Sequence, residues 1–549
     1  MVQTILWRIY NKVGQELYKV GLFREAEDAF LTAIKRGEKL ESQKECLARS
    51  LNNLASLYTT QARYAEAEQL YLRALSIREN EFGQQHKNVA VSLNNLAELY
   101  YTQGNYAQSE ILYNRALTIW EKLWGPEHPD VATALNNLAV VYQEQGKYAE
   151  AEALYIRTLA IEEKAHGVEH PEITTCLNNL AGICRAQGKY SKAESLYNRT
   201  LAIEEKALGP DHLDLATSFN NIGLLYYEQG KYAEAETFYS RSLAIRERAW
   251  GRKHPDVAAS LNNLAGVYQE QGKQNEAESF YQQALAIKES ALGPEHPDVA
   301  TALNNLAGIY VAQQKYDQAE STYRRAQDNW EKALGAKHPD LAKCIHNLAF
   351  LYERIGKYPK AETHYRRALA ISSEIYEPDH PEVMLNLRRL VYVSNIQGKY
   401  AEAELIYRRI LSVQEKTLEP NHVDIATTLQ DLGLVYYHLK KYDEAELFLR
   451  RALSIFSEGF DTKNSDIGTI FHNLAILYEA NGQHREAEHN YQQALSIYEK
   501  TMEVDFEKFA LSLKSYATML RKLERNDEAT KLENHAQAVR IKYPDNKSL

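Results

Sequence analysis

The sequence predicts an all-α protein in which about thirteen helical hairpins stack into one right-handed solenoid. The first observation is the phrase Leu-Asn-Asn-Leu-Ala, which begins at Leu51, Leu93, Leu135, Leu177, Leu261 and Leu303. Neighbouring copies such as Leu93 and Leu135 lie 42 residues apart. The same period passes through altered copies at Phe219, Ile345, Leu387, Leu429, Phe471 and Leu513, and a displaced copy near Tyr10 precedes them all. Self-similarity at a fixed period of this length indicates stacked repeats.

The second observation is the spacing of apolar residues inside one repeat, which predicts two helices. Val131, Leu135, Leu138, Ala139 and Tyr142 fall on one helical face, and we name this first element helix A. The same periodicity resumes after a break and defines helix B, with apolar residues at Tyr148, Ala151, Leu154, Tyr155, Leu159 and Ile161. One hairpin cannot bury both faces alone, so neighbouring hairpins must stack.

Start and stop signals agree with these two helices. Pro129 suits the first turn of helix A, and Asp130 beside it favours the positive helix N-terminus. Gly146 stands where a left-handed C-terminal cap is needed. We therefore expect an N-terminal capping hairpin at 1–40, a continuous array at 41–525, and a C-terminal capping helix and tail at 526–549.

Composition and charge exclude several classes of protein. The chain carries 74 acidic and 64 basic residues and a net charge of -10, without the basic stripe that duplex nucleic acid requires. No apolar run reaches the length of a membrane span, and the first ten residues lack the apolar core of a signal peptide. The four cysteines form no CxxC pair, which suits a reducing compartment. We expect a cytoplasmic protein without membrane insertion.

Catalytic and metal-binding motifs are not found. One histidine recurs per repeat, as at His86, His128 and His170, but neighbours on successive hairpins lie too far apart to share a zinc ion. A loop or capping role before helix A fits these histidines better. The sequence shows no glycine-rich phosphate loop, nucleophile elbow or HExxH motif. We expect no enzyme activity, no cofactor, and no catalytic or metal-binding residues.

The repeat resembles those of a known family. The segment from His128 to Arg157, HPDVATALNNLAVVYQEQGKYAEAEALYIR, is similar to the tetratricopeptide repeats of kinesin light chains and of nephrocystin-3-like and bacterial stand-alone arrays. The resemblance covers nearly the whole chain and implies a scaffold that holds a peptide or protein partner in a concave groove. The repeats begin almost at Met1 with no heptad coiled coil ahead of them, so a motor heavy chain is not an expected partner.

The second asparagine of each phrase is the leading candidate for peptide binding. On a helical wheel Asn137 lies opposite the packing face of Leu135, and the resemblance implies that the matching asparagine grips cargo peptide. A carboxamide both donates and accepts, so a ladder could pair with an extended backbone of any sequence. In the alternative interpretation they bond a neighbouring helix and fix the stacking. The candidates are Asn53, Asn95, Asn137, Asn179, Asn221, Asn263, Asn305 and Asn347.

Specificity is expected from positions that differ between repeats. Four residues before the asparagine the chain varies from Arg49 to Lys343, with threonines, Val91 and Ala259 between them, and the resemblance indicates a second position late in helix B. The peptide-binding candidates from these two positions are Arg49, Lys343, Arg78, Trp120 and Arg246.

Two questions stay open at this stage. After Leu387 the asparagine pair is replaced by Arg388-Arg389, Gln430-Asp431 and Lys514-Ser515, so these repeats either leave the groove or line it with other chemistry. The function is either a static scaffold or a regulator whose superhelix curvature responds to ligand. An enzyme with a site built between distant repeats is a third class, which an open groove does not favour.

Overall fold

The computed structural model describes residues 2–19, 22–40, 44–459 and 465–543. It divides into two compact units, Met1–His380 and Pro381–Leu549, which are described separately. All regular elements in the described residues are helices, and they pair into hairpins that we number from the N-terminus. The predicted all-α solenoid of helical hairpins is confirmed.

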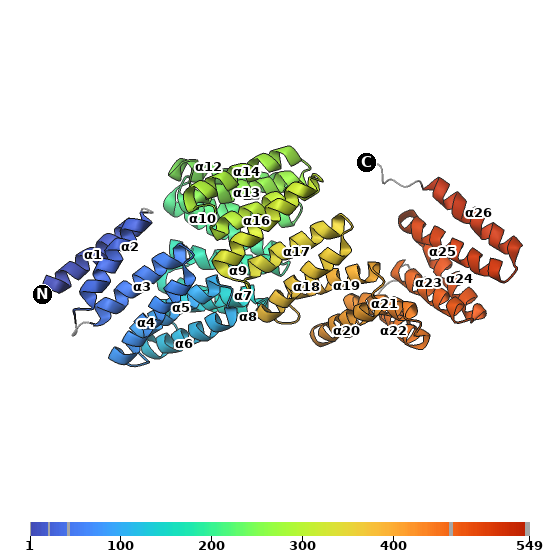
Figure 1. Cartoon of the computed structure of the whole chain (residues 1–549), viewed down its shortest axis with the longest axis horizontal. Helices are drawn as coiled ribbons and strands as arrows, with labels where there is room; N and C mark the ends of the chain where they lie inside the picture. The colour runs from blue at the N-terminus through green and yellow to red at the C-terminus, as the bar shows by residue number, and fades with distance from the viewer. Residues whose placement is uncertain (1, 20–21, 41–43, 460–464, 544–549) are drawn as a thin grey trace. The chain divides into compact units, whose positions relative to one another are not determined.

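The first unit contains hairpins 1 to 9, each made of an odd-numbered helix A and an even-numbered helix B (Figure 1). A 3-10 turn, η1 (Pro171–Ile173), leads into α9. The helices are α1 (Val2–Lys19), α2 (Phe23–Gly37), α3 (Lys44–Thr60), α4 (Tyr64–Phe82), α5 (Lys87–Thr102), α6 (Tyr106–Trp124), α7 (Pro129–Glu144), α8 (Tyr148–His166), α9 (Thr174–Ala186), α10 (Tyr190–Leu208), α11 (Leu213–Glu228), α12 (Tyr232–Trp250), α13 (Pro255–Glu270), α14 (Gln274–Leu292), α15 (Pro297–Ala312), α16 (Tyr316–Leu334), α17 (Pro339–Arg354) and α18 (Tyr358–Ile375).

The second unit contains hairpins 10 to 13. Its last helix packs against the one before it and so completes hairpin 13 as a helix B. The predicted boundaries at 40 and 525 stay a prediction, and residues 544–549 of the expected tail lie outside the described residues. The helices are α19 (Pro381–Ile396), α20 (Tyr400–Thr417), α21 (Val423–His438), α22 (Tyr442–Gly459), α23 (Ser465–Ala480), α24 (His484–Lys500), α25 (Met502–Lys522) and α26 (Asn526–Lys542).

The helix boundaries follow from local signals in the sequence. His128 precedes α7, and its Nδ1 accepts a hydrogen bond of 3.2 Å from the backbone N–H of Asp130. This satisfies one of the free N–H groups at the helix start, and equivalent histidines cap α5, α11, α13, α15, α17 and α21. The capping role predicted for the histidines is confirmed. Gly146 has a φ of 77°, as the turn between the two helices requires.

The hydrophobic core lies between hairpins as much as within them. One cluster joins Ala139 of α7 and Ala151 and Tyr155 of α8 to Leu180 and Ile183 of α9. The two alanines are fully buried and let the helices approach closely, while the ring of Tyr155 fills the remaining space. Each hairpin thus completes the core of its neighbour.

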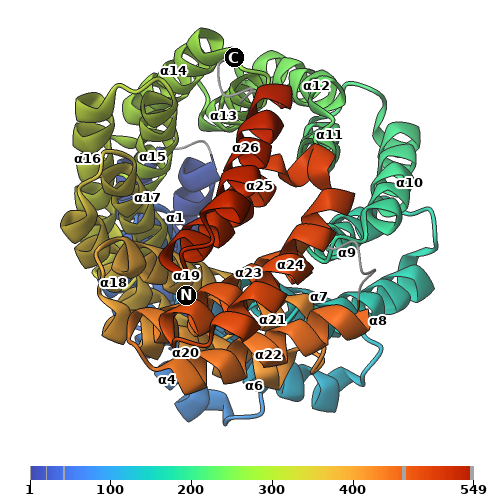
Figure 2. The same ribbon diagram turned by 90° about the vertical axis from the view of Figure 1, so that its right-hand side faces the viewer.

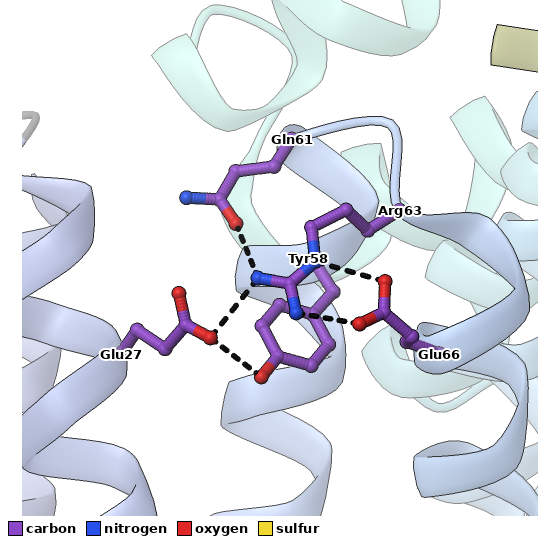
Figure 3. A network of polar contacts seen from close by, with 5 residues as sticks. All are labelled: Glu27, Tyr58, Gln61, Arg63 and Glu66. Carbon is purple, nitrogen blue, oxygen red and sulfur yellow. Dashed lines mark hydrogen bonds and ion pairs between the residues drawn. The ribbon is translucent and has the colours of Figure 1, made fainter. Parts of the chain in front are cut away.

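Polar contacts reinforce the same junctions. Between hairpins 1 and 2, Glu27 of α2 accepts hydrogen bonds from the hydroxyl of Tyr58, at 2.8 Å, and from Nη1 of Arg63, at 3.0 Å (Figure 3). Arg63 also pairs with Glu66, and its guanidinium carbon lies 3.7 Å from the centre of the Tyr58 ring. The tyrosine–glutamate pair recurs at later junctions, for example between Tyr226 and Glu194. These contacts fix the register of one hairpin on the next.

Within the first unit, the two helix types occupy different sides. The odd-numbered helices from α7 to α17 line the inner side of the unit, and the even-numbered helices from α8 to α18 line its outer side (Figure 2). Because helix B and the adjacent hairpins cover the rest of helix A, the remaining face of helix A is directed inward.

A long-range contact joins hairpins 3 and 9 of the first unit. Nε2 of His338 lies 3.1 Å from the carbonyl oxygen of Thr102, which is 236 residues away in sequence. Gly104 is in a left-handed conformation, and a Cβ placed there would lie only 2.3 Å from Cδ of Pro339. The rings of Tyr106 and Tyr376 lie 6.1 Å apart, and Tyr376 stacks on His380. Glycine at 104 is therefore required by both conformation and space.

This contact should weaken in acid. Burial lowers the pKa of His338, and it lowers the pKa of His380 to about 4. A histidine whose folded pKa lies below its unfolded value favours folding while neutral, so stability is lost as the pH falls from about 6.5 toward 4. We expect the protection factors of the amides of residues 102–106, which are their exchange rates corrected for the intrinsic slowing of exchange in acid, to fall over that range. Gly104→Ala should lower the same protection factors already at pH 7, and protection at pH 5 equal to that at pH 7 in the unaltered protein would contradict this pH dependence.

Candidate peptide-binding surface

One face of each helix A remains uncovered after the hairpins have stacked. On α7 it carries Thr133, Asn137, Val140 and Glu144, at spacings that keep them on one helical face, and we name this set of positions the inner stripe. Thr133 is exposed and the other three are half-buried, whereas Leu135 between them is fully buried. The inner stripe is therefore the part of helix A that a partner can reach.

The predicted asparagines lie on this stripe and link successive hairpins. Nδ2 of Asn137 donates to Oδ1 of Asn94 in the preceding hairpin at 3.0 Å, and Asn179 donates to Asn136 at 2.9 Å. Asn53, Asn263 and Asn347 make the equivalent bond to Asn11, Asn220 and Asn304. All eight candidates are half-buried, including Asn95, Asn221 and Asn305. The hydrogen bonds to a neighbouring helix that the alternative interpretation expects are therefore present.

The bond between hairpins uses only part of the hydrogen-bonding capacity of each carboxamide. Each asparagine has two N–H donors and one carbonyl oxygen, and the ladder bond from Asn137 to Asn94 engages a single donor. The peptide-binding role of the ladder stays a prediction, and the same side chain can serve both purposes.

The variable position four residues before the asparagine is accessible. Arg49 of α3 and Lys343 of α17 are exposed, as are Thr133, Thr175 and Thr217 between them. These side chains extend from helix A without being enclosed by the adjoining hairpins. They are therefore the sequence-predicted residues best placed to distinguish one partner from another.

The second set of predicted specificity residues lies near the end of helix B and not on helix A. The side chain of Arg78 is only 5% exposed; it pairs with Glu45 at 2.8 Å and donates to Oγ of Ser92 at 2.9 Å. Trp120 is buried, and Arg246 is half-buried and donates to Oγ of Ser260 in the next hairpin. Arg78 and Arg246 thus join adjacent hairpins and Trp120 is enclosed, while the predicted contact of all three with a peptide stays a prediction.

Two carboxylates on the inner stripe have altered acidity. Burial raises the pKa of Glu98 and of Glu144 above the usual range for glutamate. Both lie on the stripe between the ladder asparagine and the C-terminal end of helix A. The stripe thus offers amide, hydroxyl, apolar and partly desolvated acidic groups in an order that changes from hairpin to hairpin.

The buried arginine gives a test of structural against binding residues. Arg78→Ala leaves Glu45 and Ser92 without their partner, and we expect a loss of about 2 kcal/mol, reduced from the fully buried case because Glu45 is a third exposed. Amides of α4 and α5 should exchange hydrogen about 30-fold faster. Arg49→Ala, at an exposed position, should leave these rates within about 2-fold. If both variants changed the exchange rates of α4 and α5 equally, the buried contacts of Arg78 would not contribute to the stability of this junction.

The described residues contain no group of three or more His, Cys, Asp or Glu side chains placed to hold a metal ion. Among the described helices, none is both long and apolar enough to cross a membrane.

Comparison with solved structures gives three examples of similar chains. BtubC (BKLC) from P. vanneervenii is 25% identical over 45% of this chain and 92% of its own, with a TM-score of 0.34. A putative kinesin light chain from Podosopora anserina with nearly identical TPR-like repeats is 24% identical over 44% and 95%, with a TM-score of 0.28. A Rap protein complexed with competence and sporulation factor is 16% identical over 67% and 98%, with a TM-score of 0.45. With TM-scores below 0.5, these similarities add nothing to the assignment made below.

The family assignment comes from the repeats themselves. No curated protein matches the chain in sequence. The tetratricopeptide repeat profile matches eleven segments, most of which overlap, at residues 8–80, 46–122, 88–164, 130–206, 172–248, 214–290, 298–374, 344–393, 382–458, 449–500 and 466–542. These segments span nearly all of the helical hairpins, and the repeat class inferred from the sequence is confirmed. The chain belongs to the tetratricopeptide repeat family.

Proposed function

We propose that this protein is an interaction scaffold that binds a segment of a peptide or protein partner along the inner stripe. The observation that carries the proposal is the inner stripe itself, where a constant amide stands beside an exposed residue that varies from Arg49 through threonines to Lys343. A constant group suits the backbone of a partner, which is the same in every sequence. A variable group suits recognition of its side chains.

The family assignment supports this proposal, because solenoids of stacked repeats offer long surfaces to partners. We propose that the protein acts without a cofactor and without catalysis, in the cytoplasm. Arg49, at the N-terminal end of the stripe, favours an acidic part of the partner there.

A second candidate function is regulation through curvature. The contact between Thr102 and His338 joins hairpins that are far apart in sequence, and a partner that binds better when this contact is open would shift the population toward the open form. A change in radius of gyration on binding, measured by small-angle X-ray scattering, would favour this role over a static scaffold.

The proposed function is tested by blocking the inner stripe without disturbing the stacking. A double variant with Thr133→Trp and Thr175→Trp places large rings on α7 and α9, at exposed positions outside the core. We expect capture of the natural partner from an extract of the source organism to fall at least about 10-fold, because the rings occupy the space of the partner segment. Quantitative mass spectrometry of the captured proteins measures the loss.

The matched control makes the same change on the outer helices of the same hairpins. Ala153→Trp and Ser195→Trp on α8 and α10 are likewise exposed and should leave capture unchanged. Circular dichroism and thermal melting establish that both variants are folded. Partner capture that survives the inner substitutions, or that is lost only with the outer ones, would place the binding surface elsewhere.

A further inference from the structure

The second unit contains two adjoining hollows at hairpins 10 and 11. Their volumes are about 310 and 400 Å³, at the lower end of the range for small-ligand sites. Both are lined by Tyr392, Asn395, Tyr407 and Asp431, which therefore form one continuous site across α19, α20 and α21. We name these four residues the acidic hollow.

Asp431 stands where the earlier hairpins carry the ladder asparagine. It lies 294 residues after Asn137, which is seven repeats of 42, so the acidic hollow lies on the inner stripe of hairpin 11. The exchange of an amide for a carboxylate removes both N–H donors and adds a negative charge. The degenerate repeats thus continue the stripe with different chemistry.

The carboxylate of Asp431 is only partly compensated. Its Oδ2 accepts a hydrogen bond of 3.3 Å from the hydroxyl of Tyr407, and burial raises its pKa to about 6. The nearby cation Arg388 pairs with Asp424 instead, with 3.7 Å between Nη2 and Oδ2. At neutral pH Asp431 therefore carries a charge in a desolvated place, where the positive charge of Arg388 favours it only from a distance and no described residue forms an ion pair with it.

The side-chain carbonyl oxygen of Asn395 is a second hydrogen-bond acceptor close to Asp431. Asn395 donates through Nδ2 to the hydroxyl of Tyr407 at 3.3 Å, but its Oδ1 is buried and makes no hydrogen bond within the described structure. The polar chain runs from Asn395 through Tyr407 to Asp431 and leaves acceptors at both ends. A ligand that satisfies them must bring several N–H donors.

Aromatic and apolar side chains surround these acceptors. Tyr392 is 48% exposed and Ile396 43% exposed, and both line the hollow; Leu385, on the same stripe of α19, is 40% exposed. The ring of Tyr400 lies at the hollow and stacks on His438, with 4.4 Å between ring centroids. Aromatic faces attract cations, and the exposed apolar stripe offers contact to carbon side chains.

We propose that the acidic hollow receives the guanidinium or ammonium group of an arginine or lysine of the partner, with apolar partner residues packed along Leu385, Tyr392 and Ile396. The inference rests on the proposed scaffold function and adds the chemistry of its partner. A cation supplies the donors that Asp431 and Asn395 lack and forms charge-assisted hydrogen bonds. An acidic side chain would place a second negative charge beside Asp431, and a neutral apolar one would leave Oδ1 of Asn395 without a donor and the charge of Asp431 without an ion pair.

The test measures binding of four fluorescein-labelled heptapeptides to the full chain by fluorescence anisotropy. All have leucine and alanine flanks, and the central residue is arginine, lysine, norleucine or glutamate. We expect the arginine and lysine peptides to bind at least about 10-fold more tightly than the other two. Asp431→Asn should reduce that preference to about 2-fold or less, while Tyr392→Ala should weaken all four peptides.

The pH dependence supplies an independent readout. Because the raised pKa of Asp431 is about 6, protonation between pH 7 and pH 5 removes its charge. The arginine peptide should bind more weakly at pH 5 than at pH 7, and the norleucine peptide should not change. His438 also lines the hollow, and burial lowers its pKa, so its protonation in acid adds a positive charge there. In Asp431→Asn the difference between the two peptides should therefore shrink to the part that His438 causes, and an undiminished difference would contradict the role of Asp431.

The matched control is Asp443→Asn, which removes one exposed acid from α22, the other helix of hairpin 11, and should keep the full preference. Equal binding of all four peptides, a preference that survives Asp431→Asn in a folded variant, or no binding up to about 1 mM would overturn the proposal. These results do not depend on the tryptophan variants of α7 and α9. The peptide experiment can therefore contradict cation binding at the acidic hollow while the proposed scaffold function stands, and the reverse is also possible.

Discussion

A hairpin of two amphipathic helices can bury its apolar faces only against another hairpin, and every other feature of this chain depends on that constraint. The cluster that joins Ala139 and Tyr155 to Leu180 contains side chains from two successive hairpins. A single hairpin therefore lacks part of its hydrophobic core. Burial of such side chains contributes the main favourable free energy of folding. The polar contacts, such as Tyr58 with Glu27, then select one register among the apolar packings available.

The same constraint decides which residues are left for a partner. Helix B and the neighbouring hairpins cover helix A on the remaining sides, and the inner stripe is what remains. The asparagine ladder lies at the edge between the two regions: it bonds the preceding hairpin and still borders the accessible face. Under the proposed function, a partner that bonds to this carboxamide would also act on the junction between hairpins, so partner binding would be coupled to the stacking geometry.

Local and periodic features of the fold could be predicted from the sequence. The period, the two helices per repeat, the histidine caps such as His128 and the glycine turn at Gly146 depend on residues close to one another in the chain. The same reasoning did not anticipate that Arg78 would be enclosed, because its burial comes from the following hairpin, with Ser92 as a partner. A helical wheel of one helix contains no information about that neighbour.

Contacts between distant parts were also beyond sequence reasoning. The contact of Thr102 with His338 depends on how small rotations add up over several hairpins, which no single repeat encodes. The acidic hollow had a visible signal, since Asp431 replaces an asparagine of the ladder. Its meaning required the structure, because only there do Tyr407 and Asn395 come together beside it, with Oδ1 of Asn395 buried and without a hydrogen bond in the described residues.

The central claim is that partners bind the inner stripe, and carbene footprinting of the partner complex tests it most directly. A photoactivated diazirine labels accessible side chains in the free and the bound protein, and mass spectrometry reads the sites. The account predicts that binding reduces labelling at inner positions such as Val91, Thr133 and Thr217, and leaves outer residues such as Ile156, which is 50% exposed, unchanged. Protection of Ile156 and the outer helices, with the inner stripe still labelled, would contradict it.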